Sequence, residues 1–335
     1  MKNVLHLWAV SNFNAGDYLL GPATRQWFEN NVFRANFTLL SCRNYFNEEA
    51  VDRINEKYDA LLIGGGGLIL PDTNPNKISC WQWKISKDNI DKIKIPIYVV
   101  SIGYNLFYNQ NICMPNINNN NQDKTRLQIF NDNITTLIDK SEYFSVRHNG
   151  DIELLKKHVP VSLHDKITFQ FCPTINYAKS LSSGVKSSNT IAFEIKEDRT
   201  WRRYHKTTKK KFFNDILKFC KEIEGEREIA VLLHEPRNTN IIQYLKKYGV
   251  ELRVIKNYEI WAKRTIENFE SIDTLYCMAG HSQMVAMGLG CETKSIITHN
   301  KLKFFLEDIG QYKYENYIDP NTEDVYKKLM EVYNG

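Results

Sequence analysis

The chain has 335 residues, of which 42% are hydrophobic and 25% are charged, an ordinary composition for a globular protein. Its formal net charge of +5 is too small to indicate a nucleic-acid-binding protein, and it fits an anionic small substrate or brief contact with a membrane surface. A chain of this length exceeds what one hydrophobic core usually holds, so we predict two domains.

The seven cysteines indicate free thiols rather than disulfides or zinc ligands. Their number is odd, no two of them form a Cys-x-x-Cys pair, and most lie in apolar runs. No apolar stretch approaches the length of about 18 residues that a transmembrane helix needs. Free thiols indicate a cytoplasmic protein. Since no group of carboxylates and histidines has the spacing of metal ligands, we expect no metal, and we expect no cofactor either.

The chain begins with a predicted strand, a polar turn and a helix. The apolar residues Val4 to Val10 predict a buried strand, and a helix is expected over residues 18–30. The turn between them carries Asn14, Gly16 and Asp17 at the end of the strand. Asp17 is interpreted either as the cap of the helix or as a hydrogen-bond acceptor for a sugar hydroxyl, with Asn14 and Gly16 beside it in an acceptor site.

Four consecutive glycines follow the buried strand predicted over residues 60–63. Gly64, Gly65, Gly66 and Gly67 would let the backbone approach a ligand closely and expose N–H groups to it. We therefore predict that they bind the acceptor, including a diphosphate where it carries one; the alternative is a tight crossover between strand and helix. The run is neither a P-loop nor a dinucleotide fingerprint, because no Lys-Ser/Thr pair follows it and the spacing differs.

A predicted strand over residues 143–146 delivers Arg147 at its end. An arginine there is well placed for a bidentate grip on a carboxylate or phosphate. The alternative is a surface salt bridge.

The only Ser/Gly-rich stretch, Ser180 to Ser188, is predicted as the linker between the domains. Strands and helices alternate on both sides of it, which indicates α/β architecture with two doubly wound parallel sheets and a ligand cleft between the domains. The predicted ranges are 1–180 for the N-terminal acceptor domain, 189–320 for the C-terminal donor domain, and 321–335 for a C-terminal helix.

His281 is predicted to lie at the junction between a strand and the helix that follows it. The apolar run that ends at Cys277 predicts a buried strand, and the helical spacing of apolar residues resumes at Met284. His281, flanked by Gly280 and Ser282, lies between them. Ligands of open α/β sheets bind at the carboxyl ends of strands, and a helix N-terminus offers N–H groups to an anion. The alternative is that His281 is only a neighbour of the helix cap.

Two further polar residues, His234 and Lys301, follow predicted strands over residues 228–233 and 295–298. The densest positive charge lies nearby in sequence and includes Arg202 and Arg203 beside Trp201. Interleaved cations and aromatic rings suit a phosphate- or nucleotide-binding rim. A solvated first helical turn is the alternative.

Together these motifs resemble the polysaccharide pyruvyl transferase family over most of the chain, from about residue 12 to residue 309. The resemblance implies a glycosyltransferase-B-like fold of two Rossmann-like domains. It implies transfer of the enolpyruvyl-derived group of phosphoenolpyruvate, the donor substrate, to a sugar of a cell-surface polysaccharide or its lipid-linked precursor, giving a pyruvate ketal. The residues that carry it are Asn14-Ala15-Gly16-Asp17, Tyr58 to Gly67 with Asp72, Ser101-Ile102-Gly103, Phe144-Ser145-Val146-Arg147, Gly280-His281, and Gly288 to Lys301.

The family usually has Arg-Leu-His at this strand–helix junction, where the arginine and histidine engage the donor. This chain keeps His281 but has Ala279 in place of the arginine. Either Ala279 is native divergence, with Arg147 or Arg202 taking over, or it is an engineered substitution that inactivates the protein. With Ala279, Gly280 and Ser282 around the donor, we interpret His281 as the general acid or phosphate partner.

The remaining roles follow from positions at strand ends. Arg147 and Lys301 are expected to bind the donor's anionic ends, Asp17 to position or activate the acceptor hydroxyl, and His234 to serve as a second acid or base. A lipid-linked acceptor would require visits to the inner face of the plasma membrane, for which the region around Trp201 is the candidate contact. The rival functions are a glycosyltransferase that uses a nucleotide sugar and a catalytically inactive sugar- or anion-binding homologue.

Overall fold

The computed structural model describes residues 1–9, 14–70, 76–107, 121–184, 189–321 and 324–334. The chain forms two compact units. The first comprises Met1–Val10, Leu20–Leu106 and Gln110–Pro173, and the second Ser11–Leu19, Phe107–Asn109 and Thr174–Gly335. The units are therefore not two consecutive stretches of sequence, whereas the predicted ranges divide the chain once, near residue 180. The first turn of the first helix and Phe107 both belong to the second unit.

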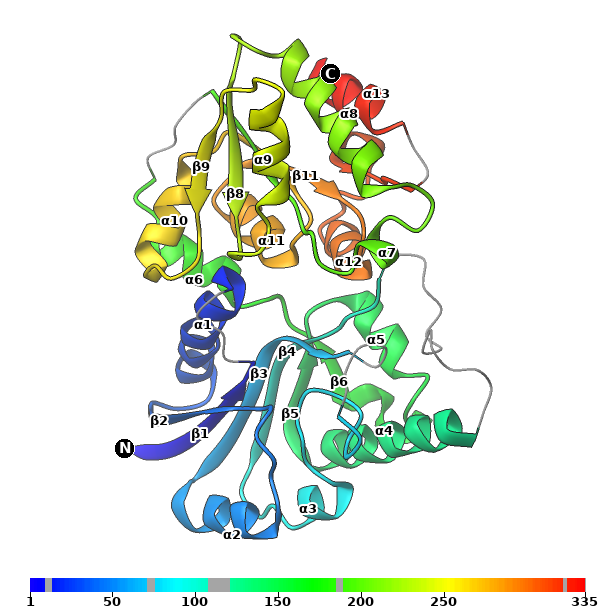
Figure 1. The fold of residues 1–335 in the computed structure, drawn as a ribbon. Helices are drawn as coiled ribbons and strands as arrows, with labels where there is room; N and C mark the ends of the chain where they lie inside the picture. The colour runs from blue at the N-terminus through cyan, green and yellow to red at the C-terminus, as the bar shows by residue number, and fades with distance from the viewer. Residues whose placement is uncertain (10–13, 71–75, 108–120, 185–188, 322–323, 335) are drawn as a thin grey trace. The chain divides into compact units, whose positions relative to one another are not determined.

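Each unit contains a six-stranded parallel sheet, which confirms the predicted α/β class with two doubly wound sheets (Figure 1). The strand order is β2-β1-β3-β4-β5-β6 in the first unit and β12-β11-β10-β7-β8-β9 in the second. The strands are β1 (Lys2–Trp8), β2 (Ala35–Ser41), β3 (Ala60–Ile69), β4 (Ile97–Tyr104), β5 (Ser141–Val146), β6 (Ile167–Phe169), β7 (Thr190–Glu194), β8 (Glu228–Leu233), β9 (Arg253–Lys256), β10 (Thr274–Cys277), β11 (Glu292–Ile296) and β12 (Tyr317–Ile318).

The helices alternate with the strands. They are α1 (Ala15–Asn31), α2 (Glu48–Lys57), α3 (Lys87–Asp91), α4 (Asn121–Lys140), α5 (Asn149–Leu155), α6 (Thr174–Leu181), α7 (Thr200–Arg203), α8 (Lys209–Glu222), α9 (Asn240–Lys247), α10 (Ala262–Glu270), α11 (Gly280–Gly288), α12 (Asn300–Asp308) and α13 (Val325–Asn334), with 3-10 turns at Val161–Lys166 and Tyr314–Asn316. Helix α6 occupies the beginning of the predicted linker, of which residues 185–188 lie outside the described part.

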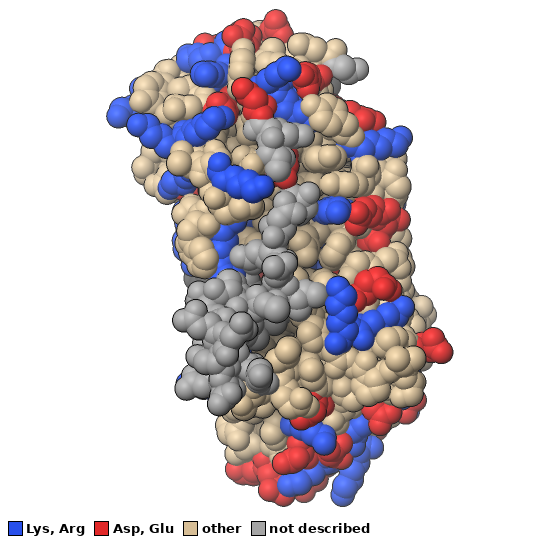
Figure 2. All heavy atoms as spheres, turned by 90° about the vertical axis from the view of Figure 1, so that its right-hand side faces the viewer, with Lys and Arg blue, Asp and Glu red and all other residues tan. Residues whose placement is uncertain are grey.

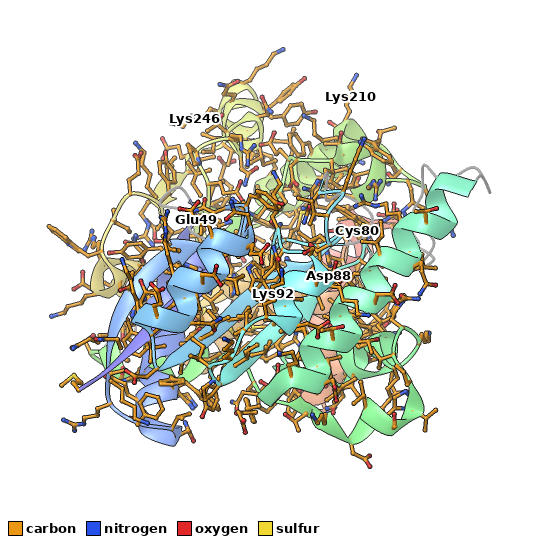
Figure 3. All side chains as sticks on the ribbon, turned by 90° about the horizontal axis from the view of Figure 1, so that it is seen from below. Glu49, Cys80, Asp88, Lys92, Lys210 and Lys246 are labelled. Carbon is orange, nitrogen blue, oxygen red and sulfur yellow. The ribbon has the colours of Figure 1, made fainter. Side chains whose placement is uncertain are left out.

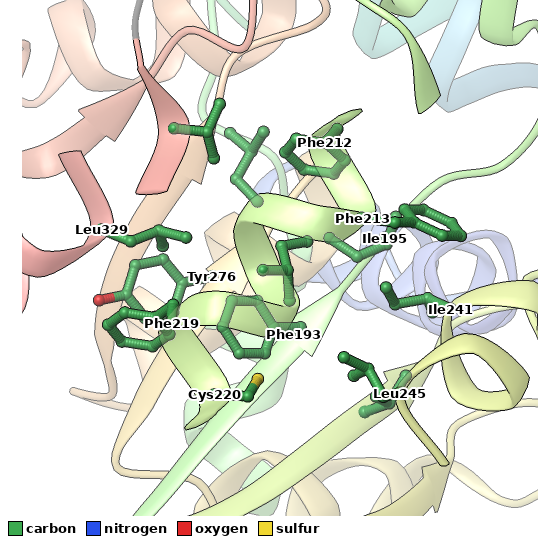
Figure 4. Close-up of a cluster of buried hydrophobic side chains, with 14 of the residues drawn as sticks. Phe193, Ile195, Phe212, Phe213, Phe219, Cys220, Ile241, Leu245, Tyr276 and Leu329 are labelled. Carbon is green, nitrogen blue, oxygen red and sulfur yellow. The ribbon is translucent and has the colours of Figure 1, made fainter. Parts of the chain in front are cut away.

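Aromatic side chains fill the core on one face of the second sheet. Phe193 of β7 stacks on Tyr276 of β10 with ring centroids 5.1 Å apart, and Phe219 of α8 meets Tyr276 edge-on at 5.8 Å. Leu329 of α13 joins the same cluster (Figure 4). Figure 1 shows α8 and α13 side by side over this face. Each buried aromatic ring stabilises the fold by about 2–3 kcal/mol, so this layer fixes β7 and β10 against each other.

The opposite face of the second sheet is covered by α6, α10 and α11. Val285 and Ala286 of α11 are fully buried there, together with Phe269 of α10. Helix α11 is thus held along its length by apolar packing, and the position of its first turn follows from that packing.

Each sheet has one switch point, a pair of neighbouring strands from which the chain adds further strands in opposite directions. In the second unit this point lies between β7 and β10, and their last residues, Glu194 and Cys277, are paired directly. In the first unit it lies between β1 and β3, where Leu7 pairs with Ile63. Ligands of doubly wound sheets bind outside the carboxyl ends of the strands at such a point. The residues that follow Glu194, Cys277 and Ile63 are therefore the first to consider as a site.

Charges of both signs alternate on the face drawn in Figure 2, without a broad field of one sign. Figure 3, seen from below, labels Lys92 just after α3; its ammonium pairs with Glu48 of α2 at 2.7 Å. Both side chains are exposed, so this pair adds little to stability. In the described ranges, no helix combines the length and the apolar character that crossing a membrane requires.

Three buried histidines make stability depend on pH. Burial lowers the pKa of His6 to about 3 and that of His158 to about 4, and it holds the pKa of His234 well below the ordinary 6.5. A histidine with a lowered pKa takes up its proton more readily in the unfolded chain. Its contribution to stability is therefore present above pH 6.5 and is lost as the pH falls toward the folded pKa.

From pH 7.5 to 5.5 we expect each of these histidines to cost about 1.4 kcal/mol of unfolding free energy, or about 4 kcal/mol together. Urea unfolding followed by circular dichroism at the two pH values measures this loss. In the His6→Gln variant the loss should shrink by about a third; an unchanged loss would show that His6 is not involved.

Candidate active site

The second unit places His281 at the beginning of a helix, as the sequence predicts. Strand β10 ends at Cys277, and Ala279 is the N-cap of α11, with extended backbone angles of φ −107° and ψ 131° and no side-chain cap. His281 is therefore the second residue of the helix and is half-buried. The N–H groups of this first turn have no partners within the helix, and the helix dipole adds a partial positive charge to them. The location suits an anion.

The first turn of α1 lies against the His281 ring. A Cβ built on Gly16 would lie only 2.2 Å from Nδ1 of His281 and 2.6 Å from its Cγ. Only glycine therefore allows the ring to occupy this place. Asn14 caps α1, since its Oδ1 accepts the N–H groups of Gly16 at 3.0 Å and Asp17 at 3.2 Å. The prediction that Asp17 is the cap is thus wrong, and Asp17 lies half-buried in the first helical turn.

His234 connects α1 with α11. Its Nε2 lies 2.9 Å from Oδ1 of Asn14, and its Nδ1 lies 3.2 Å from Oγ of Ser282. Because the amide oxygen can only accept, Nε2 carries the proton and Nδ1 accepts from the serine hydroxyl. The N–H of Gly16 is also 3.2 Å from Nε2 but has the Asn14 oxygen at 3.0 Å as its acceptor.

With Nδ1 as an acceptor, His234 is neutral, and its burial favours that form. Burial lowers its pKa well below 6.5, and the positive charges of Lys196, His281 and Lys301 lower it further. Both ring nitrogens are occupied by protein groups. The geometry therefore favours a positioning role for His234 over the predicted role as a second acid or base.

A group of charged side chains lies buried behind the junction. Glu194, which is 0% exposed, accepts the backbone N–H of Ala279 at 2.7 Å and that of Met278 at 3.0 Å through one oxygen, Oε2. Lys196 lies 3.9 Å from the other oxygen and 2.6 Å from Glu235. Burial raises the pKa of Glu194. Burial would also raise the pKa of Glu235, but the charge and hydrogen bond of Lys196 outweigh it and lower that pKa.

Lys301 of α12 covers the start of α11. A Cβ on Gly280 would come within 3.1 Å of Cδ of Lys301, so the aliphatic stem of the lysine packs on the glycine backbone. The buried Gln283 joins the two helices, because its Nε2 donates to Oγ of Ser295 and to the carbonyl of Leu302. The predicted donor-binding residues of this unit thus lie together: Ala279, Gly280, His281, Ser282 and Lys301.

The two arginines of the basic segment are buried rather than solvated. Arg202 and Arg203 are 4% and 6% exposed, which overturns the alternative of a solvated helical turn. Arg203 donates to Thr298 at 3.1 Å and pairs with Asp198 at 2.8 Å. Both guanidinium groups lie over the ring of Phe107, at 5.7 and 5.2 Å from its centroid. Trp201 remains exposed beside them.

In the first unit the glycine run lies inside β3 instead of following the strand as a loop. A Cβ on Gly64 would come within 2.2 Å of the Val100 carbonyl of β4. One on Gly65 or Gly66 would come within 3 Å of Leu20 of α1, and one on Gly67 within 1.5 Å of Nδ2 of Asn105. Close packing of β4, α1 and Asn105 therefore accounts for the glycines, and their predicted acceptor role stays a prediction.

Arg147 is buried at the end of β5, so the alternative of a surface salt bridge is wrong. Its guanidinium lies against the backbone of Gly103, where a Cβ would come within 2.3 Å of Nε. It donates from Nη2 to Oδ1 of Asn105. Arg147 is thus a rigidly held cation in the first unit.

Sequence reasoning overlooked Glu194, Lys196 and Glu235. A signal was present, because the apolar strand Thr190 to Ile195 contains a glutamate and is followed directly by a lysine. A charged residue in a buried strand is rarely tolerated without a partner. Over the described part of the chain, no three His, Cys, Asp or Glu side chains gather in a way that could hold a metal ion.

The contact between Gly16 and His281 generates a prediction. A Gly16→Ala substitution should push the imidazole away and shift the ring NMR signals of His281 and His234, because the new methyl group would overlap the ring. Gly21→Ala is the matched control on the same helix, since its Cβ would lie 3.1 Å from the Trp8 ring, a much milder contact than 2.2 Å, and would not touch His281. Unchanged His281 signals in Gly16→Ala would contradict the contact.

Comparisons with known proteins address the fold and the family of the chain. No curated protein matches the chain. The S. aureus MnaA–UDP co-structure is similar with a TM-score of 0.57 and 10% identity, covering 100% of this chain and 89% of that one. Methanocaldococcus jannaschii UDP-GlcNAc 2-epimerase in complex with UDP-GlcNAc and UDP is similar with a TM-score of 0.54 and 12% identity, covering 100% and 93%.

At these identities the structural likeness shows the fold alone, a glycosyltransferase-B-like combination of two Rossmann-like units, as predicted. The family model described as polysaccharide pyruvyl transferase matches residues 14–287. Because this match spans most of the sequence, including Asn14, Arg147 and His281, the chain belongs to the polysaccharide pyruvyl transferase family.

Proposed function

We propose that the protein transfers the enolpyruvyl-derived group of phosphoenolpyruvate to a sugar and forms a pyruvate ketal. Family membership supports the reaction class. The observation that carries the proposal is the placement of His281. It lies in the first turn of α11, next to the switch point between β7 and β10. Its ring packs against Gly16, and Lys301 lies over the neighbouring Gly280.

The reaction asks for a proton donor and for anion-binding groups. Protonation of the methylene carbon of phosphoenolpyruvate leaves an oxocarbenium-like centre at C2, to which one sugar hydroxyl adds. The C2–O bond to phosphate then breaks, and a second hydroxyl of the sugar adds to close the ketal. In sum, the two hydroxyl protons go to the methyl group and to the released phosphate. We assign the proton donation or phosphate contact to His281 and electrostatic stabilisation to the α11 N-terminus and Lys301.

Asp17 is the candidate residue for the acceptor. Asp17 follows the Asn14 cap and is half-buried in the same unit as His281, so we assign it to the acceptor hydroxyl. Arg147 remains the candidate for an anionic group of a substrate in the first unit. The acceptor is a sugar of a polysaccharide or of its lipid-linked precursor, and the exposed Trp201 is the candidate for contact with a membrane surface at the cytoplasmic side.

A second candidate function is supported by the structural neighbours. MnaA and the epimerase bind UDP or a UDP-sugar according to their structures, so a nucleotide-sugar donor fits the same fold. In that case Arg202 and Arg203 would be the rim for the diphosphate. A catalytically inactive sugar- or anion-binding homologue is the third candidate, because Ala279 stands where the family has arginine.

Thermal-shift measurements separate the three functions. A ligand that binds only the folded state raises the melting temperature, by mass action. We expect a rise with phosphoenolpyruvate and none with UDP, CMP or GDP sugars. A rise with a nucleotide sugar alone would establish the second function, and no rise with any ligand would favour the third.

Catalysis is tested with the His281→Ala variant. If His281 donates the proton, loss of general acid catalysis should lower phosphate release from phosphoenolpyruvate by about 100-fold or more. His164→Ala is the control, since that side chain belongs to the other unit and hydrogen-bonds to the Lys156 and Val159 carbonyls. Full activity of His281→Ala would remove the central assignment.

The missing arginine makes Lys301 the main donor-binding cation in the proposal. Loss of a charged hydrogen bond costs about 1.5–3 kcal/mol, so Lys301→Met should raise the KM for phosphoenolpyruvate by about 10- to 100-fold. Lys303→Met on the same helix removes a lysine that pairs with Glu307 and should leave KM unchanged. Equal effects of the two substitutions would show a general effect of charge.

A further inference from the structure

We propose that Glu194 is a positioning residue for His281: its carboxylate fixes the Ala279 N-cap of α11 and thereby the direction in which the histidine ring enters the site. The proposal deepens the proposed function, on which its kinetic test rests. It stands on the contacts of a carboxylate that belongs to β7, a strand distant in sequence from the junction that it holds.

Glu194 holds the peptide units that precede the helix. Ala279 donates its N–H to Oε2 at 2.7 Å, a short distance typical of a charge-assisted bond. The N–H of Met278 is shared between the same oxygen and the Glu194 carbonyl, both at 3.0 Å. The N–H of an N-cap has no partner within its own helix. Glu194 supplies that partner and so defines the plane of the peptide from which Gly280 and His281 continue.

Burying the Glu194 carboxylate costs free energy that a purely structural contact at this strand end would not need to spend. Removing a carboxylate from water costs several kcal/mol, and a well-packed apolar residue at such a strand end is often as stable. Lys196 compensates only in part, because its ammonium is 3.9 Å from Glu194 and 2.6 Å from Glu235. An acidic side chain is nevertheless retained at the end of β7, beside Cys277 at the switch point.

The charged side chains around Glu194 also contact the residues that hold Gly16 against the His281 ring. Glu235 binds both Lys196 and, at 3.1 Å, Nδ2 of Asn14. Asn14 in turn caps the helix whose Gly16 lies against His281. The backbone that carries the histidine and the backbone on which its ring packs are therefore joined through Glu194, Lys196 and Glu235. A change at Glu194 should alter the ring position without removing any group that touches the substrate.

Two substitutions distinguish the effect of the length of the Glu194 side chain from the effect of its charge. Glu194→Asp keeps the charge but is one methylene too short to keep both N–H bonds, whereas Glu194→Gln keeps the reach and loses the charge. If reach positions His281, kcat should fall by about 10- to 100-fold in Glu194→Asp and less in Glu194→Gln. A smaller loss in Glu194→Asp than in Glu194→Gln would overturn the proposal.

A double-mutant cycle tests whether Glu194 acts through His281. Glu194→Asp combined with His281→Ala should be no slower than His281→Ala alone, because the positioned group is already gone. Losses that multiply would indicate an independent structural role and overturn the proposal. The control is Glu270→Gln, a buried carboxylate in the same unit that accepts from Ser182 and Ser183 and should leave kcat unchanged.

NMR spectra test the positioning role independently of catalysis. If the wild-type protein transfers no pyruvyl group, the proposed function is rejected, but this test of Glu194 still holds. In NMR spectra, Glu194→Asp should move the amide proton of Ala279 upfield and shift the ring signals of His281, while Glu270→Gln leaves both in place. Unmoved His281 signals in Glu194→Asp, in a variant whose circular dichroism shows it folded, would overturn the positioning role.

Discussion

The site depends on a close approach of two helix beginnings, because the imidazole of His281 lies where the side chain of residue 16 would otherwise be. A contact of this kind holds only if both backbones are fixed. One is fixed by the Asn14 cap, and the other by the burial of α11 and by the Glu194 carboxylate. His234 joins the two through Asn14 and Ser282, and burial keeps it neutral by lowering its pKa. The His281 ring is therefore held by a histidine that does not readily take up a proton.

Burial separates the roles of the charged residues. Fully buried Glu194 accepts two backbone N–H groups, and the buried Lys196 pairs with Glu235, so both side chains organise structure. Half-buried Lys301 lies over Gly280 at the start of α11, where a charge can still meet a ligand. A site that binds an anion needs both kinds of group, since an unsupported cation would move with the ligand instead of orienting it.

The sequence predicted the architecture well because hydrophobic periodicity and strand-end polar residues are local signals. It placed His281 correctly at a strand–helix junction for that reason. It could not separate two reasons for Gly64 to Gly67, because a glycine needed for close packing of Leu20 looks the same in sequence as one that binds a ligand. It missed Glu194 because the partners of this carboxylate lie more than 80 residues away, so only the tertiary fold brings them together.

The alanine at position 279 is consistent with these constraints. Its side chain is 5% exposed, and its N–H is committed to Glu194. An arginine starting from this enclosed position would bring a cation close to Lys196 and Lys301, and before the donor arrives its charge would be costly to desolvate. Alanine avoids that cost and lets the junction form without a ligand. Under the proposed function, the alanine would weaken the attraction for the donor, an exchange of function for stability at a site of concentrated charge. The arrangement around Gly280 leaves Lys301 as the residue of this unit on which the proposed donor affinity then depends.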